Sequence, residues 1–346
     1  MSSAARTPVF RLMLDSKDIT TSFAKRLESL TLTDNRGFEA DQLDIVLLDR
    51  DGKLDLPSRG AKLSLALGWL GAPLVEKGQY VVDEVEHSGA PDKLTLRARS
   101  ADLRAGLSTK KERSWHRQTV GSIVRKIARE ASLKPAIAPT LDSQAVAHID
   151  QTAESDINLL SRLATLHGAI ATVKAGRLLF IKAGAGQTAS GAAIAQVHIT
   201  RQHGDGHRFA IADRETYTAV RAYFQDTKGA KKGEVLIDKA GPVKANKKTR
   251  PSIESTKTLR HTYASKANAQ RAAKAEWDRL QRGVATFSLT LAKGRPELFP
   301  EQPAAVSGWK PAIDGLPWII GKATHKLDSS GFTTDLELEV RAEVVA

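Results

Sequence analysis

Residues 302–342 read QPAAVSGWKPAIDGLPWIIGKATHKLDSSGFTTDLELEVRA, and residues 60–98 read GAKLSLALGWLGAPLVEKGQYVVDEVEHSGAPDKLTLRA. Both stretches run from a short apolar strand into Gly-Trp, pass a loop that contains proline, and reach a strand that leads to a histidine. Both then turn into a strand in which apolar and polar residues alternate. The shared landmarks lie about 240 residues apart: Gly68-Trp69 with Gly308-Trp309, and His87 with His325. The sequence therefore predicts one β-module that occurs twice.

The rest of the first hundred residues supports a β-rich fold. Apolar side chains alternate with polar ones in short segments such as 30–32 and 43–47. Between such segments lie turns whose Gly, Asn and Asp residues tolerate a positive φ, at residues 34–37 and 49–52. Short strands separated by turns of this kind are typical of a small barrel or sandwich. We predict a mainly β protein with two similar antiparallel β-barrels.

The pattern changes after Trp115, where two helices are indicated. Residues 123–128 carry an apolar stripe at helical spacing. A second apolar stripe follows Ser155, which is a good N-cap, and Gly168 is suited to end that helix. A β-hairpin is then expected over residues 170–181. These elements predict a small α+β insert between the β-rich parts.

The remaining chain is expected to return to β structure. The stretch 183–195 is low in large side chains and is a predicted linker, and strands are predicted at 219–224 and 234–237. Residues 265–282 favour a helix, but its apolar face is thin, so we expect it to lie across a barrel rather than form a core. The predicted domains are 1–114, a first barrel of the tube type; 115–182, the α+β insert; 183–215, a linker and strands returning to the first barrel; and 216–346, a second barrel with a basic loop and the long helix.

Composition limits the classes of function. A hydrophobic content of 41% is ordinary for a globular protein, and 346 residues suffice for two or three domains. The count of 0 Cys excludes disulfides, thiolate catalysis and cysteine-based zinc sites. The first residues do not form a signal peptide, and no apolar run approaches the ~20 residues that span a bilayer. We therefore expect no membrane partner.

The net charge of +13 raises the question of nucleic-acid binding. The positive excess is concentrated between Lys228 and Arg282, and residues 228–260 contain no aromatic side chain that could stack on a base. A solvated loop, or contact with an acidic protein neighbour, explains this segment as well as a nucleic acid does. The sequence thus favours protein partners over nucleic acid. Neutralising Lys231, Lys232, Lys247 and Lys248 is expected to weaken assembly with such a neighbour.

The best metal candidates are His203, Asp205 and His207, which could supply nitrogen and oxygen ligands. Zinc motifs usually place such ligands on a helix or strand at fixed spacing, whereas these lie in a Gly-rich stretch, so the pattern favours a turn without a metal. Residues 184–191 are superficially similar to a phosphate loop, but they lack its Lys-Ser/Thr pair and a convincing following helix. We therefore predict no metal site and no cofactor.

No catalytic residue is indicated either. Three acids lie within residues 83–86, but the counterpart in the second module, residues 321–324, has none. No Gly-x-Ser-x-Gly motif marks a serine nucleophile. Because His87 and His325 recur in both modules, we expect them to share a packing or hydrogen-bonding role. The tryptophans are expected in core or interface positions rather than on a sugar-stacking surface: Trp69, Trp115, Trp277, Trp309 and Trp318.

Several stretches together carry a family resemblance. Residues 151–164, QTAESDINLLSRLA, follow the pattern Gln-x-x-Glu-Ser-Asp-x-x-Phe-Leu-x-Arg-Leu-Ala, with Leu159 where Phe is common. The other matching stretches are TLTDN from residue 31, LDI from 43, GQYVVDEV from 78, DGLPW from 314 and HKLDSSGFTTDLEL from 325. In this combination the chain resembles the late control protein D family, the baseplate hub of contractile-tailed phages, and is similar to the hub part of the VgrG spike proteins of type VI secretion.

The resemblance implies a fold and a role. Hubs of this family carry two similar β-barrels and an inserted domain, and they form a homotrimer. Three chains would then present six barrels around a channel and join a sixfold tail tube to a threefold spike. The implied partners are the tail tube protein, the trimeric tail spike protein, other baseplate proteins and the tape measure protein. The implied location is the cytoplasm of the bacterial host during assembly, and then the baseplate of a virion or of an R-type pyocin particle.

The resemblance also implies a structural protein without enzymatic activity. The sequence ends soon after the second module, at Ala346, so we expect the spike to be a separate polypeptide. The alternative function is a tail-associated peptidoglycan hydrolase. That alternative predicts lytic activity of the purified chain that one Asp or Glu substitution abolishes.

Overall fold

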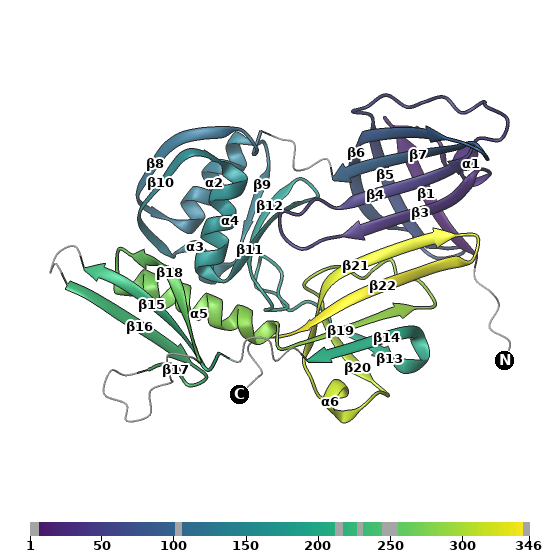
Figure 1. Cartoon of the computed structure of the whole chain (residues 1–346). Helices are drawn as coiled ribbons and strands as arrows, with labels where there is room; N and C mark the ends of the chain where they lie inside the picture. Colours follow the sequence, from purple (N-terminus) through teal and green to yellow (C-terminus); the bar gives the residue numbers. More distant parts are fainter. Residues whose placement is uncertain (1–6, 101–105, 212–216, 227–230, 244–254, 342–346) are drawn as a thin grey trace.

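A computed structural model describes residues 7–100, 106–211, 217–226, 231–243 and 255–341 (Figure 1). The two repeated modules lie together in one half of the molecule, and the insert lies in the other half beside a small sheet with one long helix (Figure 1). Within the described ranges, no helix is long and apolar enough to cross a membrane. Each module is part of a larger set of strands, and we call these sets the first repeat (residues 8–100) and the second repeat (residues 197–211 and 285–340).

The first repeat is a path of six antiparallel strands with two short elements beside it. Its elements are β1 (Pro8–Leu14), β2 (Lys17–Asp18), α1 (Thr20–Ala24), β3 (Leu27–Asp34), β4 (Gln42–Leu48), β5 (Lys62–Trp69), β6 (Val75–Ser88) and β7 (Lys93–Ser100). In space the strands follow the order β3-β4-β7-β6-β5-β1. The two predicted turns are confirmed, because Gly37 and Gly52 adopt φ angles of 74° and 63°, which glycine takes at no steric cost.

The second repeat has the same spatial order. Its elements are β13 (Val197–Thr200), η2 (Arg201–His203), β14 (Gly204–Ile211), β19 (Ala285–Leu291), β20 (Pro303–Ser307), α6 (Pro311–Asp314), β21 (Trp318–Asp328) and β22 (Gly331–Val340). Its strands follow the order β14-β19-β22-β21-β20-β13, so each strand matches its counterpart in chain order. One pair differs, because β13 runs parallel to β20 whereas β1 runs antiparallel to β5.

The predicted internal repeat is confirmed at the level of single residues. A β-bulge interrupts β6 at Asp83 and β21 at Gly321, at the same distance before His87 and His325. Tyr80 and Trp318 then occupy equivalent positions on the two strands, and both are buried. The repeat therefore includes the irregularities of the strands as well as their order.

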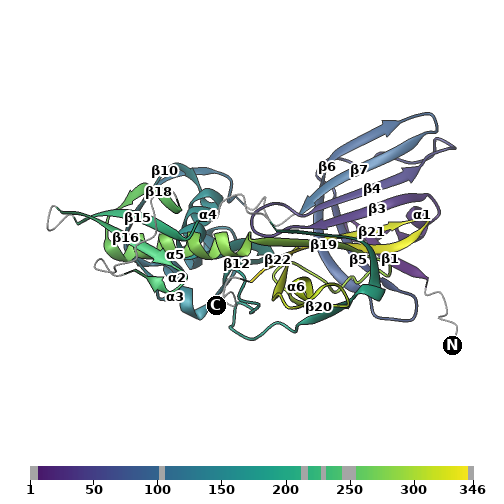
Figure 2. The same cartoon turned by 60° about the horizontal axis from the view of Figure 1, so that its bottom comes forward.

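The two repeats form a single sheet. β21 of the second repeat pairs antiparallel with β3 of the first, and a 13-stranded sheet results. Figure 2 shows β6, β7, β4 and β3 as successive neighbours, with β21 next to β3. Each repeat has its own apolar core, but Leu327 and Phe332 of the β21–β22 hairpin belong to the core of the first repeat. The mainly β fold is confirmed.

The insert contains both predicted helices and the predicted hairpin. Its elements are β8 (Lys110–Thr119), α2 (Val120–Glu130), β9 (Lys134–Ile137), α3 (Pro139–Asp142), β10 (Ala145–Ser155), α4 (Asp156–His167), β11 (Ala169–Lys174) and β12 (Arg177–Lys182). Ser155 caps α4 by accepting a hydrogen bond from the Asn158 amide at 3.2 Å, and Gly168 ends it in the left-handed conformation. The predicted boundary between residues 114 and 115 lies inside β8.

A further unit lies between β14 and β19 in the chain. It consists of β15 (Ala219–Asp226), β16 (Lys231–Asp238), β17 (Gly241–Pro242), β18 (Thr256–Tyr263) and α5 (Lys266–Arg282). Ala269, Ala273 and Trp277 of α5 form a core with Val220 and Ile237 of this sheet. The expectation that this helix lies across a barrel without forming a core was wrong, because small alanines let α5 approach the sheet closely while Trp277 fills the remaining space.

Candidate functional site

The metal candidates do not come together as a site. His203 lies in η2, where its Nδ1 accepts a hydrogen bond from the Thr200 amide at 3.1 Å. His207 lies on β14, with its ring 6.2 Å from the Phe287 ring and 6.1 Å from the Trp309 ring. In the part of the chain that the structure describes, no group of three His, Cys, Asp or Glu residues is placed to hold a metal ion.

The predicted linker is held by side chains of the second repeat. The Gly184 amide donates to Glu301 Oε2 at 2.7 Å. The Arg341 guanidinium donates to the carbonyls of Gly184 and Ala185 at 3.0 and 2.9 Å. A phosphate loop binds its ligand through backbone N–H groups, and those of Gly184, Thr188 and Gly191 already donate to acceptors within the chain.

The basic segment is only partly described. Lys247 and Lys248 lie outside the described residues. Lys232 lies on β16 with its ammonium 5.2 Å from the centre of the Tyr223 ring, a cation–π distance. One cation of the basic segment therefore makes a contact inside the small sheet.

The tryptophans occupy core and joint positions. Trp115, Trp277 and Trp318 are buried. The half-buried Trp69 lies 5.5 Å from the Phe332 ring of the second repeat, and its Nε1 donates to the Gly294 carbonyl at 3.0 Å. The prediction of core or interface anchors is confirmed for these four side chains.

The two repeats are joined across a polar site that contains buried charges. We use "joint" for the β21·β3 pairing and the side chains that cross it. Arg36, in the loop after β3, forms ion pairs with Glu301 at 2.8 Å and with Glu339. Burial raises the pKa of Glu301, although the Arg36 charge opposes this. Arg36 is therefore the cation that compensates a buried carboxylate across the joint.

The insert is attached to the same region. Lys174 Nζ donates to Asp34 at 2.8 Å and also binds Asp41, and Thr172 Oγ1 donates to the Gly37 carbonyl at 2.6 Å. A cavity of about 720 Å³ lies between the first repeat, the insert and the linker, and Phe299 lines it. These contacts fix the orientation of the insert relative to β3 and β4.

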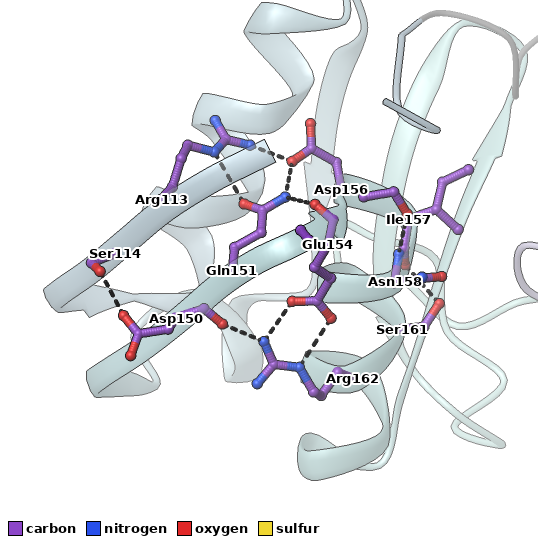
Figure 3. A network of polar contacts seen from close by, with 12 residues as sticks. Arg113, Ser114, Asp150, Gln151, Glu154, Asp156, Ile157, Asn158, Ser161 and Arg162 are labelled. Atoms are coloured by element: carbon purple, nitrogen blue, oxygen red, sulfur yellow. Dashed lines mark hydrogen bonds and ion pairs between the residues drawn. The ribbon is translucent and has the colours of Figure 1, made fainter. Parts of the chain in front are cut away.

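The QTAESD segment forms a closed polar network inside the insert (Figure 3). Gln151 is 0% exposed, and its Nε2 donates to Asp156 Oδ1 at 2.8 Å while its Oε1 accepts from Arg113 at 3.0 Å. Lys111 donates to the other Asp156 oxygen at 2.6 Å, and Glu154 pairs with Arg162 at 2.7 Å. The acids of this motif thus lock the paired strands β8 and β10 to α4 and are occupied by structural contacts.

The two landmark histidines have different surroundings. His325 is 0% exposed, its Nδ1 lies 3.0 Å from Thr334 Oγ1, and burial lowers its pKa to about 3. The His87 side chain is 43% exposed, and its Nε2 lies 3.5 Å from Asp49 Oδ2. The expectation of a shared packing role was wrong for the single chain. The reason is that β3 pairs along β21 beside His325, whereas β5 pairs with β6 only up to Val82.

The face of the sheet opposite the cores is polar in both repeats. Strands β4, β7, β19 and β22 alternate buried apolar residues with outward polar ones. Glu84 faces Arg97 across β6 and β7, and Lys322 faces Glu337 at the equivalent place in β21 and β22, so the ion pair recurs with its charges reversed. This arrangement gives a hydrophilic surface of mixed charge.

Comparison with known sequences gives consistent matches. The family model described as phage tail baseplate hub (GPD) matches residues 39–331. The probable baseplate hub protein of Escherichia phage 186 is 51% identical over 362 residues, which cover 96% of this chain and 93% of that protein. The probable baseplate hub protein of Escherichia phage P2 is 50% identical, and the match covers 97% of this chain and 94% of that protein.

Solved structures share the fold at low sequence identity. The 43 kDa tail protein of prophage MuSo2 from Shewanella oneidensis matches with a TM-score of 0.68 and 14% identity, over 97% of this chain and 99% of that chain. A type VI secretion component of E. coli, described as structurally similar to the T4 tail proteins gp27 and gp5, matches with a TM-score of 0.53 and 16% identity, over 92% of this chain and 74% of that chain. A chain from a Francisella PdpA–VgrG complex matches with a TM-score of 0.54 and 7% identity, over 98% of this chain and 59% of that chain.

Proposed function

The chain belongs to the phage tail baseplate hub (GPD) family, and from this premise we propose that three copies close a ring in which six repeats surround a channel. The family makes it a structural baseplate hub protein of a contractile phage tail, and so a component of the virion and not an enzyme. The alternative of a peptidoglycan hydrolase loses its support, because both curated relatives carry the name of baseplate hub proteins.

The observation that carries the proposal is the repeated strand order of the two halves. A sixfold tube and a threefold spike have no common subunit arrangement unless one protein offers both symmetries. A trimer of a chain with two equivalent modules offers six similar positions on one side and three identical chains on the other. In this ring each repeat closes into a barrel, and the first and second repeats alternate.

The ring would bind different partners at its two ends. We infer that the tail tube stacks on the end with six similar positions and that a trimeric spike docks on the other end. The fold shared with a chain of a PdpA–VgrG complex supports the placement near a spike. Other baseplate proteins and the tape measure protein complete the set of partners, and assembly takes place in the host cytoplasm.

The polar face of the sheet would line the channel. Its outward residues are largely Ser, Thr and ion-paired side chains, and Ser288, Thr290 and Thr333 are examples on β19 and β22. A surface of this composition stays hydrated and offers no large apolar patch to a passing polymer. The apolar faces then point away from the channel, into the barrels.

The test is the mass of the purified full chain and its place in the particle. Light scattering after size exclusion should give three times the 37.4 kDa chain mass. A cryo-EM reconstruction of the particle should place three chains on the tail axis between tube and spike. A hub with another copy number on the axis, or a chain located away from the axis, would contradict the proposal.

A further inference from the structure

The first repeat leaves a strand edge open at the place where the second repeat has its joint. In β21, residues 322–326 pair with β22 on one edge and lie alongside β3 on the other. In β6, the equivalent residues 84–88 pair with β7 on one edge. Among the described ranges, no strand pairs with their other edge, because the β5 partner ends opposite Val82. An open edge offers unpaired backbone groups to another strand.

A second open edge lies on β14. Its counterpart β3 is flanked by β4 and β21, whereas β14 pairs with β19 and is the end strand of the described sheet. Ile211, the last residue of β14, is 64% exposed. The joint pairs β21 with β3, and their counterparts β6 and β14 each have an open edge in the described part of the chain.

We propose that β6 of one chain pairs antiparallel with β14 of a second copy, and that this contact repeats the β21·β3 joint between subunits. Each copy uses β6 on one side and β14 on the other, so the interface is head-to-tail, and such an interface closes into a ring when its rotation is suitable. The inference rests on the proposed trimer and identifies the surfaces that hold it together. The occupant of each edge is the same chain, because the joint inside the chain is already built from the equivalent pair of strands.

Two equivalent rows of residues across the sheet fix the register. In the first repeat, Thr31, Asp44, Arg97 and Glu84 are successive partners across β3, β4, β7 and β6. In the second repeat, the successive partners across β14, β19, β22 and β21 are Arg208, Ser288, Glu337 and Lys322. Arg208 is therefore the equivalent of Thr31.

The register of the joint can now be transferred to the subunit interface. In the joint, Thr31 faces Lys326, and the equivalent of Lys326 on β6 is Ser88. The transferred register between the two copies is Ser88 with Arg208, His87 with Phe209, Glu86 with Ala210 and Val85 with Ile211. A slip by one residue would exchange the two faces, so the pairing is specified by the faces as well as by the rows.

The side chains of this register are complementary. Val85 packs against the core of the first repeat, and Phe209 packs against the core of the second, so the two lie on the same face of the joined sheet. Ile211 shares that face and would lie opposite Val85, which removes its exposed apolar surface from water. On the polar face, Glu86 and Arg208 would be diagonal neighbours of opposite charge, a favourable cross-strand arrangement. His87 then takes the place in the ring that His325 has in the chain.

Cysteine pairs test the register, because the chain has 0 Cys of its own. Under mild oxidation, the variant Glu86→Cys with Ala210→Cys should give covalent species of two and three chains and none larger. The matched control is Thr33→Cys with Thr324→Cys, the equivalent pair inside the joint, which should form a disulfide within one chain and no oligomer. The pair His87→Cys with Ala210→Cys places the thiols on opposite faces and should cross-link poorly.

A second variant tests the interface without a cross-link. Ile211→Asp introduces a charge at a side chain that is exposed in the isolated chain, so the fold should persist. The dissociation constant of the trimer should rise about tenfold or more, because the charge would be buried at the interface. Leu70→Asp is the control, since Leu70 is 66% exposed and lies in the loop after β5. Circular dichroism of both variants should match that of the unchanged chain.

The outcomes separate this inference from the proposed function. A trimer in solution that shows no Glu86–Ala210 cross-link and that tolerates Ile211→Asp overturns the β6·β14 interface and leaves the trimeric hub intact. Absence of a trimer, both in solution and on the particle axis, overturns both. Covalent species longer than three chains overturn ring closure while the edge pairing stands.

Discussion

The two repeats have the same strand order, the same bulge and the same cross-strand rows, yet their equivalent residues meet different surroundings. His325 is buried beside the joint, and His87 is exposed on β6. The difference has one cause, because β3 covers the β21 edge and no described strand covers the β6 edge. The comparison teaches that the module sets where a residue lies in the sheet, while the neighbouring module sets whether that residue is buried.

The strongest test of the equivalence removes the buried aromatic side chain of each repeat. Trp318→Ala and Tyr80→Ala should each lower the free energy of unfolding by about 3–5 kcal/mol, because each leaves a large core cavity. The polar ends of the two rings also match, since Tyr80 Oη donates to the Lys77 carbonyl at 2.6 Å and Trp318 Nε1 donates to the Ile313 carbonyl at 2.9 Å. Urea denaturation followed by circular dichroism measures the loss.

Tyr80→Phe is the control for this pair. It keeps the ring and removes one hydrogen bond, so it should cost only about 1 kcal/mol. If Tyr80→Ala is tolerated while Trp318→Ala unfolds the chain, the two positions are not equivalent in packing. The equivalence of the two repeats would then not extend to their cores.

The next test breaks the joint that distinguishes the repeats. Arg36→Ala should lower the free energy of unfolding by about 3 kcal/mol, because it leaves Glu301 buried without its cation. The double variant Arg36→Ala with Glu301→Gln should recover part of this loss, since the uncompensated charge is gone. Arg125→Ala, at an ion pair on the surface of the insert, should cost no more than about 1 kcal/mol.

The joint is also what could not be predicted from the sequence. The caps of α4, the turns at Gly37 and Gly52 and the hairpin of the insert depend on neighbours in the chain, and local patterns predicted them. The β21·β3 pairing joins segments far apart in the sequence, and an edge strand shows the same alternation whether it is covered or open. The different burial of His87 and His325 was missed for this reason.

Two other features were missed for reasons of packing. The α5 core depends on Ala269 and Ala273 lying close to a sheet, and alanine carries little hydrophobic signal by itself. The equivalence of Tyr80 and Trp318 was visible in principle, because both precede the landmark histidine at the same distance. The bulge decides which face of the strand the two rings take, and it has no distinct sequence signature here, since one copy has Asp83 and the other Gly321.

The pH dependence of stability should report the burial of His325. Burial lowers the pKa of folded His325 to about 3, while an unfolded histidine titrates near 6.5. The unfolded chain therefore binds more protons between these values, so stability is complete above pH ~6.5 and falls as the pH drops toward 3, by up to about 1.4 kcal/mol per unit. His167, whose pKa burial lowers to about 4, adds a loss of the same sign.

Urea midpoints between pH 7 and 4.5 measure this slope. His325→Gln should be less stable at pH 7 and should show a flatter slope below pH 6.5, and the double variant with His167→Gln should be flatter again. An identical slope in the unchanged chain and in His325→Gln would mean that the joint does not keep this side chain from water.

The smallest effect is expected where the repeats differ by the sign of a charge. Lys322 and Glu337 face each other on the polar side of β21 and β22, 3.3 Å apart, with side chains 39% and 66% exposed, at the place where the first repeat has Glu84 and Arg97. Exchanging them, as Lys322→Glu with Glu337→Arg, gives the second repeat the polarity of the first, and stability should change by less than about 0.5 kcal/mol.

The single change Lys322→Glu places two carboxylates opposite each other and should cost more than the exchange, up to about 1 kcal/mol. Urea midpoints and the mass of the trimer measure both variants. If the exchange keeps stability and trimer mass while the single change lowers stability, the fold requires opposite charges at this row but not their order. A loss above about 1 kcal/mol for the exchange would instead show that the second repeat requires the positive charge on β21 and the negative charge on β22. Because β21 is the strand that pairs with β3, backbone pairing alone would then not be sufficient to explain the joint.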